Sequence, residues 1–270
     1  MAYFNVKIVI LALEGGEKVK DKAFNIINNV TDYSLYVYGD IISGADKWDE
    51  SDVTYQDFKD AVENIKPNST LNMYISSGGG SVFATQSMMT LLDRCKKEKK
   101  CYIKAHLDAL AASCASFLPM ISDEIIVYKN TIMMLHKPMS MAYGNVNEMQ
   151  QTIDLLNKLE DSIMIPAYMS KAKEGITEDK IKDMLAAETW LNAEEICDIF
   201  NVTYIDEEKE IAAHIDYSSI KAYKNAPESL KGSFFNAQKP TIDKETQELL
   251  DRVNKKINSE EWQDSLKRWI

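Results

Sequence analysis

One short stretch of the sequence carries the residue types that nucleophilic catalysis requires. Residues 111–116 read AASCAS, which places hydroxyls among alanines at the start of a predicted helix, and His136 follows beyond one pair of predicted strands. A serine hydroxyl is a good nucleophile only when a base lies within hydrogen-bonding reach and donors stabilise the oxyanion that forms on attack. The pattern predicts an enzyme in which Ser113 is the nucleophile. Cys114 is the alternative, but consecutive helical residues point about 100° apart, so both cannot face one site.

The base and the acid of such a site are chosen from few residues. Only three histidines are present. His106 is predicted at the end of a strand and His214 at the edge of a polar segment, whereas His136 ends an apolar strand and is followed closely by Pro138, so it is the best placed. A third group must orient the imidazole. Residue chemistry alone leaves this choice open among three acids, Asp179, Asp183 and Glu188.

A glycine-rich loop precedes the serine. Residues 76–81 read SSGGGS between a predicted strand and a predicted helix, and glycines there allow close approach of the backbone or a positive φ. The loop lacks both the Lys-Ser/Thr ending of a P-loop and the GxGxxG spacing of a dinucleotide site. Backbone amides that stabilise an oxyanion fit the pattern better, and a plain strand-to-helix turn is the alternative.

The elements that must position these residues alternate along the chain. Short β-branched and aromatic runs indicate strands, and apolar residues at helical spacing indicate helices. Strands are predicted at 35–39, 70–75, 101–105, 124–128, 131–135 and 202–205, and helices at 55–65, from Ser81, 111–120, 146–172, 177–187 and 193–200. This order predicts an α/β fold with a largely parallel sheet.

The C-terminal part of the chain differs in composition. We expect the main domain to comprise residues 1–215. Residues 216–240 are rich in Ser, Lys, Asn, Gly and Pro and are predicted to be a linker. Residues 241–270 have the spacing of one or two amphipathic helices, which are too short for a core of their own. This helical extension is expected to dock on its own domain, on a neighbouring subunit or on another protein.

Composition excludes several partners. The 270 residues are 45% hydrophobic and carry 31 basic against 42 acidic side chains, a net charge of −11, which disfavours nucleic acid and anionic membrane surfaces. The four cysteines show no CxxC spacing, so neither a metal site nor disulfides are expected. The apolar stretch 6–13 is too short to cross a bilayer and is predicted to be a strand. We expect a cytoplasmic protein.

Four motifs in order resemble one family. They are residues 75–82, 111–113, 134–138 and 188–195, which read ISSGGGSV, AAS, MLHKP and ETWLNAEE. Together they resemble the ClpP class of serine peptidases, and most closely the phage-encoded head maturation proteases of that class, over residues 35–206. The resemblance implies a ClpP/crotonase-like fold of repeated ββα units, assembly into homo-oligomeric rings that enclose the active sites, and no metal or organic cofactor.

The resemblance also implies a role for each site residue. Ser113 falls on the nucleophile and His136 on the base. Gly79 and the amide of Cys114 fall on the oxyanion hole, with Gly80 alongside. Glu188 falls on the acid of the triad, where the cellular enzymes carry aspartate. Asp183 is the alternative candidate for that role.

The function expected from this resemblance is an ATP-independent serine endopeptidase. Its substrate would be a capsid or scaffold precursor protein, cleaved during phage head maturation in the host cytoplasm or inside the procapsid. Three alternatives are a ring protease that works with an ATP-driven unfoldase, a crotonase-type acyl-CoA hydratase or isomerase, and a catalytically silent assembly scaffold. The polar segment further suggests self-processing between residues 218 and 240.

Overall fold

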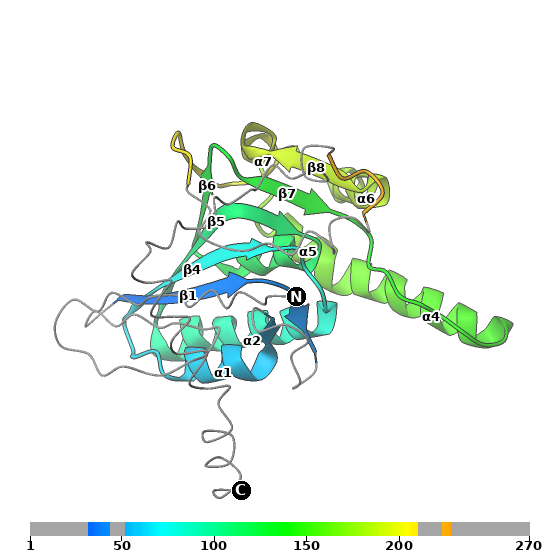
Figure 1. Cartoon of the computed structure of the whole chain (residues 1–270), viewed down its shortest axis with the longest axis horizontal. Helices are drawn as coiled ribbons and strands as arrows, with labels where there is room; N and C mark the ends of the chain where they lie inside the picture. Colours follow the sequence, from blue (N-terminus) through cyan, green and yellow to red (C-terminus); the bar gives the residue numbers. More distant parts are fainter. Residues whose placement is uncertain (1–31, 44–51, 210–222, 228–270) are drawn as a thin grey trace, which may run out of the picture. The chain divides into compact units, whose positions relative to one another are not determined.

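The computed structural model describes residues 32–43, 52–209 and 223–227 (Figure 1). All of them belong to the first of the two units into which the chain divides, Met1–Lys231 and Gly232–Ile270. The predicted strand at 6–13, the helical extension at 241–270, His214 and most of the predicted linker lie outside the described residues.

A mainly parallel sheet forms the centre of the described chain. Five strands lie side by side in the order β1 (Asp32–Tyr38), β4 (Thr70–Ser77), β5 (Tyr102–Ala112), β6 (Glu124–Tyr128) and β9 (Thr203–Ile205), and every pairing among them is parallel. β7 (Ile132–Leu135) also pairs with β5, and β8 (Thr189–Asn192) pairs with β7 antiparallel. A separate two-stranded sheet joins β2 (Ile41–Ile42) to β3 (Val53–Thr54). The prediction of a largely parallel α/β sheet is confirmed.

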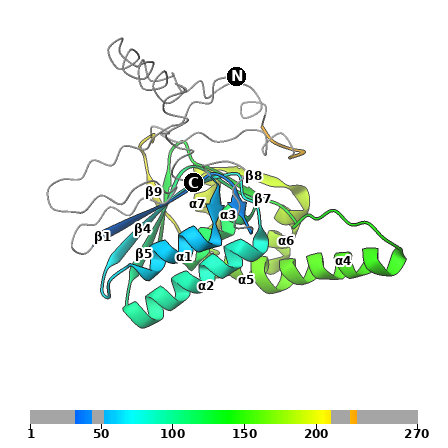
Figure 2. The same cartoon turned by 60° about the horizontal axis from the view of Figure 1, so that its bottom comes forward.

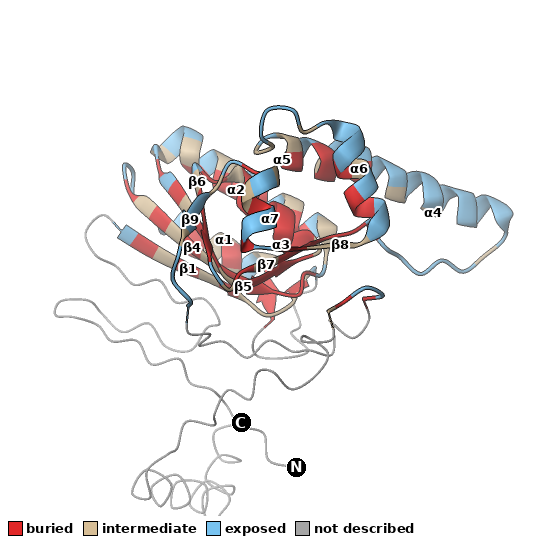
Figure 3. Cartoon of the chain, turned by 90° about the horizontal axis from the view of Figure 1, so that it is seen from above, coloured by how far each residue is buried: buried red, intermediate tan, exposed pale blue. Residues whose placement is uncertain are grey.

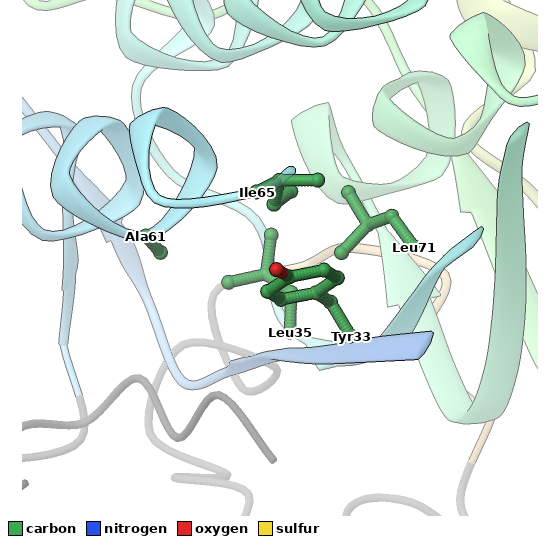
Figure 4. Close-up of a pocket in the computed structure, with 5 residues that line it drawn as sticks. All are labelled: Tyr33, Leu35, Ala61, Ile65 and Leu71. Carbon is green, nitrogen blue, oxygen red and sulfur yellow. The ribbon is translucent and has the colours of Figure 1, made fainter. Parts of the chain in front are cut away.

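Two helices cover one face of this sheet (Figures 1 and 2). α1 (Tyr55–Glu63) starts at Thr54 and α2 (Val82–Lys99) at Ser81, and each of these cap side chains accepts a hydrogen bond from a backbone N–H of the first turn. The crevice between α1 and the sheet is lined by apolar groups from both (Figure 4), namely Tyr33, Leu35, Ala61, Ile65 and Leu71, and has no room for a water molecule. It is therefore part of the core rather than a ligand site.

The remaining helices follow the Ser113 segment. They are α3 (Cys114–Phe117) with a 3₁₀ turn at Leu118–Ile121, α4 (Val146–Leu159), a π-helical turn at Glu160–Met164, α5 (Ile165–Met169), α6 (Glu178–Ala187) and α7 (Ala193–Ile199). α4 projects from the sheet and its helices (Figure 1), and most of its surface is exposed (Figure 3). Among the described helices, none has both the length and the apolar character needed to cross a membrane.

Two local predictions are wrong. The predicted helix at 111–120 begins only after Ser113, because Ala111 and Ala112 are the last residues of β5 and pair with Met133 and Met134 of β7. His106 does not end a strand but lies in the middle of β5, where its ring stacks on Tyr74. In both cases β5 is longer than its local pattern indicates, since strands on both of its edges satisfy its backbone groups.

Candidate active site

Ser113 stands at the sharp turn between β5 and α3. Its φ of 54° and ψ of −129° lie in a region that residues with a side chain rarely adopt. Both of its backbone polar groups are held: the N–H donates to the Met134 carbonyl at 2.9 Å, and the carbonyl accepts from the Ser116 hydroxyl at 2.5 Å. These two hydrogen bonds, one to β7 and one to α3, hold the strained turn in place.

The structure brings Ser113 and His136 together. The Ser113 Oγ lies 2.7 Å from His136 Nε2, and His136 follows the last residue of β7 with only 7% of its surface exposed. Burial lowers the pKa of His136 below its usual value, and the negative charge of Glu188 opposes this shift. The imidazole is therefore neutral near neutral pH, which is the state in which it can accept the serine proton.

Two glycines of the loop are required by their surroundings. A Cβ on Gly79, which has φ of 103°, would lie 2.6 Å from the Ser113 Cβ. A Cβ on Gly80, with φ of 140°, would lie 2.1 Å from the carbonyl oxygen of Ile41, to which Gly80 is joined by a parallel bridge. Gly79 thus lies directly against the predicted nucleophile, while Gly80 fastens the loop to β2.

The thiol of Cys114 is unsuited to attack. Its side chain is buried in the main hydrophobic core, and burial raises its pKa to about 12, so no thiolate is present at neutral pH. Its backbone N–H belongs to the residue directly after Ser113, the position to which the family resemblance assigns an oxyanion donor.

The three acids considered for the triad lie in different surroundings. Asp179 and Asp183 are both exposed on α6. Glu188 directly follows the last residue of α6 and has a left-handed backbone conformation, with φ of 51°. Its negative charge raises the pKa of His136 and so opposes the effect of burial. Among the hydrogen bonds of the described residues, none joins Glu188 to His136. Its carboxylate instead accepts the backbone N–H groups of Lys224 and Asn225, at 3.0 and 2.6 Å.

A cavity opens beside Ser113 and His136. Its volume is about 190 Å³, and its other lining residues are mostly apolar: Gly80, Val82, Cys114, Pro138, Met139, Met164 and Tyr223. This lining suits an apolar group of a ligand bound next to Ser113. In the part of the chain that the structure describes, no group of three or more His, Cys, Asp or Glu side chains is placed to hold a metal ion.

Sequence reasoning missed one residue of this site. Tyr223 falls in the predicted linker, yet it is buried, and its ring lies 5.2 Å from the His136 ring and 6.0 Å from that of Trp190. Tyr223 and Ala226 join a small apolar cluster with β5 and β7. An isolated aromatic residue within a polar segment was the only available signal.

Comparison with known proteins adds a family and a fold. Residues 55–200, more than half of the 270-residue chain, match the family described as Clp protease. A mutant of ClpP1 from Listeria monocytogenes has a similar structure, with a TM-score of 0.51 over 64% of this chain and 91% of that one, at 18% sequence identity. No curated protein sequence matches the chain. The ClpP-like α/β fold expected from the motifs is confirmed.

Proposed function

Since this chain belongs to the Clp protease family, which implies a serine-type peptidase, we propose that it is an endopeptidase with Ser113 as nucleophile and His136 as base. The observation that carries the proposal is the 2.7 Å contact between Ser113 Oγ and His136 Nε2 on a strained strand-to-helix turn. A serine placed only for packing requires neither a neutral, buried histidine at this distance nor a backbone held at positive φ.

The mechanism follows from these positions. His136 Nε2 takes the hydroxyl proton as Ser113 Oγ bonds to the scissile carbonyl carbon, and the carbonyl oxygen becomes an oxyanion. The amides of Gly79 and Cys114 are the proposed donors to that oxygen, with Gly80 holding the loop. His136 then gives the proton to the leaving amine, and water hydrolyses the acyl-enzyme through the same histidine. Glu188 is the proposed acid that orients the imidazole.

For the substrate we propose a structural precursor protein of a phage head, capsid or scaffold. This narrower assignment rests on the resemblance of the four sequence motifs to head maturation proteases. A crotonase-type hydratase is disfavoured because it uses carboxylates rather than a serine and histidine pair, and the cavity holds no Asp or Glu among its lining residues.

We also propose that the protein assembles with copies of itself through α4. The side chains of Val146, Met149 and Ile153 recur at three- and four-residue spacing and are 81%, 45% and 50% exposed. A projecting helix with an exposed apolar stripe is typical of a contact between subunits. Its capping box at Asn145 and Glu148 stabilises the helix before any partner binds.

Covalent labelling tests the peptidase proposal. The purified full chain is incubated with a fluorophosphonate, and the adduct is mapped by mass spectrometry. We expect labelling at Ser113 that disappears in Ser113→Ala and falls by on the order of a hundredfold or more in His136→Ala. An adduct at another serine, with none at Ser113, would refute the assignment of the nucleophile.

The assembly proposal has its own test. Met149→Glu combined with Ile153→Glu places two charges on the apolar stripe, and we expect a lower molar mass in sedimentation equilibrium than for wild type. Gln151→Glu is the matched control, because residue 151 is exposed on the opposite side of α4. Equal masses for the double variant and the control would exclude α4 as the contact.

A further inference from the structure

The segment 223–227 enters the candidate active site from a part of the chain distant in sequence. The Tyr223 ring packs edge-on against the ring of His136 and lines the cavity beside Ser113. Burial raises the pKa of the Tyr223 phenol to about 12, and the neighbouring Ser113 hydroxyl opposes that shift. The phenol is therefore protonated at neutral pH and acts as a hydrogen-bond donor.

The Tyr223 hydroxyl holds the glycine loop in one orientation. It donates to the Gly78 carbonyl oxygen at 2.8 Å. The N–H of the same peptide belongs to Gly79 and donates to the Ser77 hydroxyl at 3.1 Å. The carbonyl and N–H of a trans peptide point in opposite directions, and no described peptide bond is cis. With Gly78 bound to Tyr223, the Gly79 N–H is thus occupied and cannot donate to an oxyanion.

The same segment occupies Glu188. The carboxylate accepts the backbone N–H groups of Lys224 and Asn225, and the Asn225 side chain donates to the Ala187 carbonyl at the end of α6. A carboxylate near His136 is the group expected to orient the imidazole. Here both of its oxygens accept hydrogen bonds from the segment, and one of them also accepts the indole N–H of Trp190 at 3.4 Å.

From these contacts we propose that residues 223–227 are a latch in cis that holds the Ser113 site closed until they leave it. The inference rests on the proposed peptidase function. Departure of Tyr223 empties the space next to His136 and frees the Gly78–Gly79 peptide to turn its N–H toward Ser113. Departure of Lys224 and Asn225 frees Glu188 for the imidazole. A substrate polypeptide that binds in the cleft competes with the latch for the same contacts.

The rate of fluorophosphonate labelling at Ser113 tests the latch in the full chain. Tyr223→Phe removes the hydrogen bond to Gly78 but keeps the ring, and we expect labelling about fivefold faster than in wild type. Tyr223→Ala also removes the ring, and we expect an increase of more than about tenfold. Lys224→Ala is the matched control: it lies in the same segment, its side chain is exposed, and its backbone N–H is kept.

The possible outcomes separate the two proposals. Equal rates for wild type and both Tyr223 variants would overturn the latch and leave the peptidase intact. Slower labelling of the Tyr223 variants, with unchanged thermal unfolding, would also overturn it, because Tyr223 would then support the site. If Lys224→Ala increased the labelling rate as much as Tyr223→Ala does, the contacts of Tyr223 would not be what closes the site, and the latch as proposed would be overturned. No labelling of Ser113 in any variant would refute the peptidase function and the latch with it.

Discussion

The strained turn at Ser113 makes an unusual stability difference testable. Ser113→Ala and Ser113→Gly both remove the nucleophile, so neither is expected to react with a fluorophosphonate. They differ in the backbone conformation that they tolerate. With φ of 54° and ψ of −129°, the turn is unfavourable for any residue with a Cβ, and glycine adopts it freely.

The magnitude follows from two opposing contributions. A non-glycine residue held in such a region costs on the order of 1–3 kcal/mol. Glycine loses more conformational freedom on folding than alanine, which costs roughly 0.5–1 kcal/mol. We therefore expect Ser113→Gly to be more stable than Ser113→Ala by about 1 kcal/mol. For a domain of this size, that difference corresponds to about 2–4 °C in melting temperature.

Urea unfolding followed by circular dichroism measures the difference between the two variants. Ser116 provides the control, since it lies within α3 and has helical geometry. There the order of stability should reverse, with Ser116→Gly less stable than Ser116→Ala by about 1 kcal/mol. If Ser113→Gly proves equal to or less stable than Ser113→Ala, the turn is not strained. In that case the surrounding structure does not hold the nucleophile against its backbone preference.

Three further predictions concern Gly79, Ser116 and the His106 side chain of β5. Gly79→Ala should slow labelling of Ser113 on the order of a hundredfold, because the added Cβ would lie 2.6 Å from the Ser113 Cβ. An unchanged rate would show that the loop shifts to make room for the methyl group without disturbing the site. Ser116→Ala should cost about 2–3 kcal/mol in urea unfolding, because it leaves the buried Tyr168 hydroxyl, 2.6 Å from Ser116 Oγ, without that partner. When Ser116→Ala is made in a Tyr168→Phe background, its cost should be smaller, because no buried hydroxyl is left without a partner. If the losses of the two single variants simply add up in the double variant, the two hydroxyls are not coupled. Burial, with the charges of nearby lysines, lowers the pKa of His106 from 6.5 to about 4. Because the unfolded chain binds this proton at a higher pH than the folded chain does, the free energy of unfolding should fall as the pH drops from 6.5 to 4. His106→Gln should flatten this pH dependence in urea unfolding measured across the same range.

Several features of the fold and site could be read from local sequence. The helix starts at Thr177 and Ser81 follow from side chains that cap the first turn a few residues away. The pairing of Ser113 with His136 could be anticipated because motifs in a fixed order mark one family. The need for glycine at position 79 was also foreseeable, since a backbone that approaches a nucleophile closely leaves no space for a Cβ.

Other features depended on contacts between distant parts of the chain. Ala111 and Ala112 belong to β5 rather than to a helix because β7 pairs with them. Glu188 has a carboxylate suited to a triad, but its hydrogen-bond partners are the backbone N–H groups of residues 224 and 225 and the indole N–H of Trp190. Tyr223 reaches Gly78, 145 residues earlier in the chain. No periodicity within residues 216–240 encodes that contact, because the surface that receives Tyr223 exists only after the sheet has brought Gly78, His136 and Trp190 together.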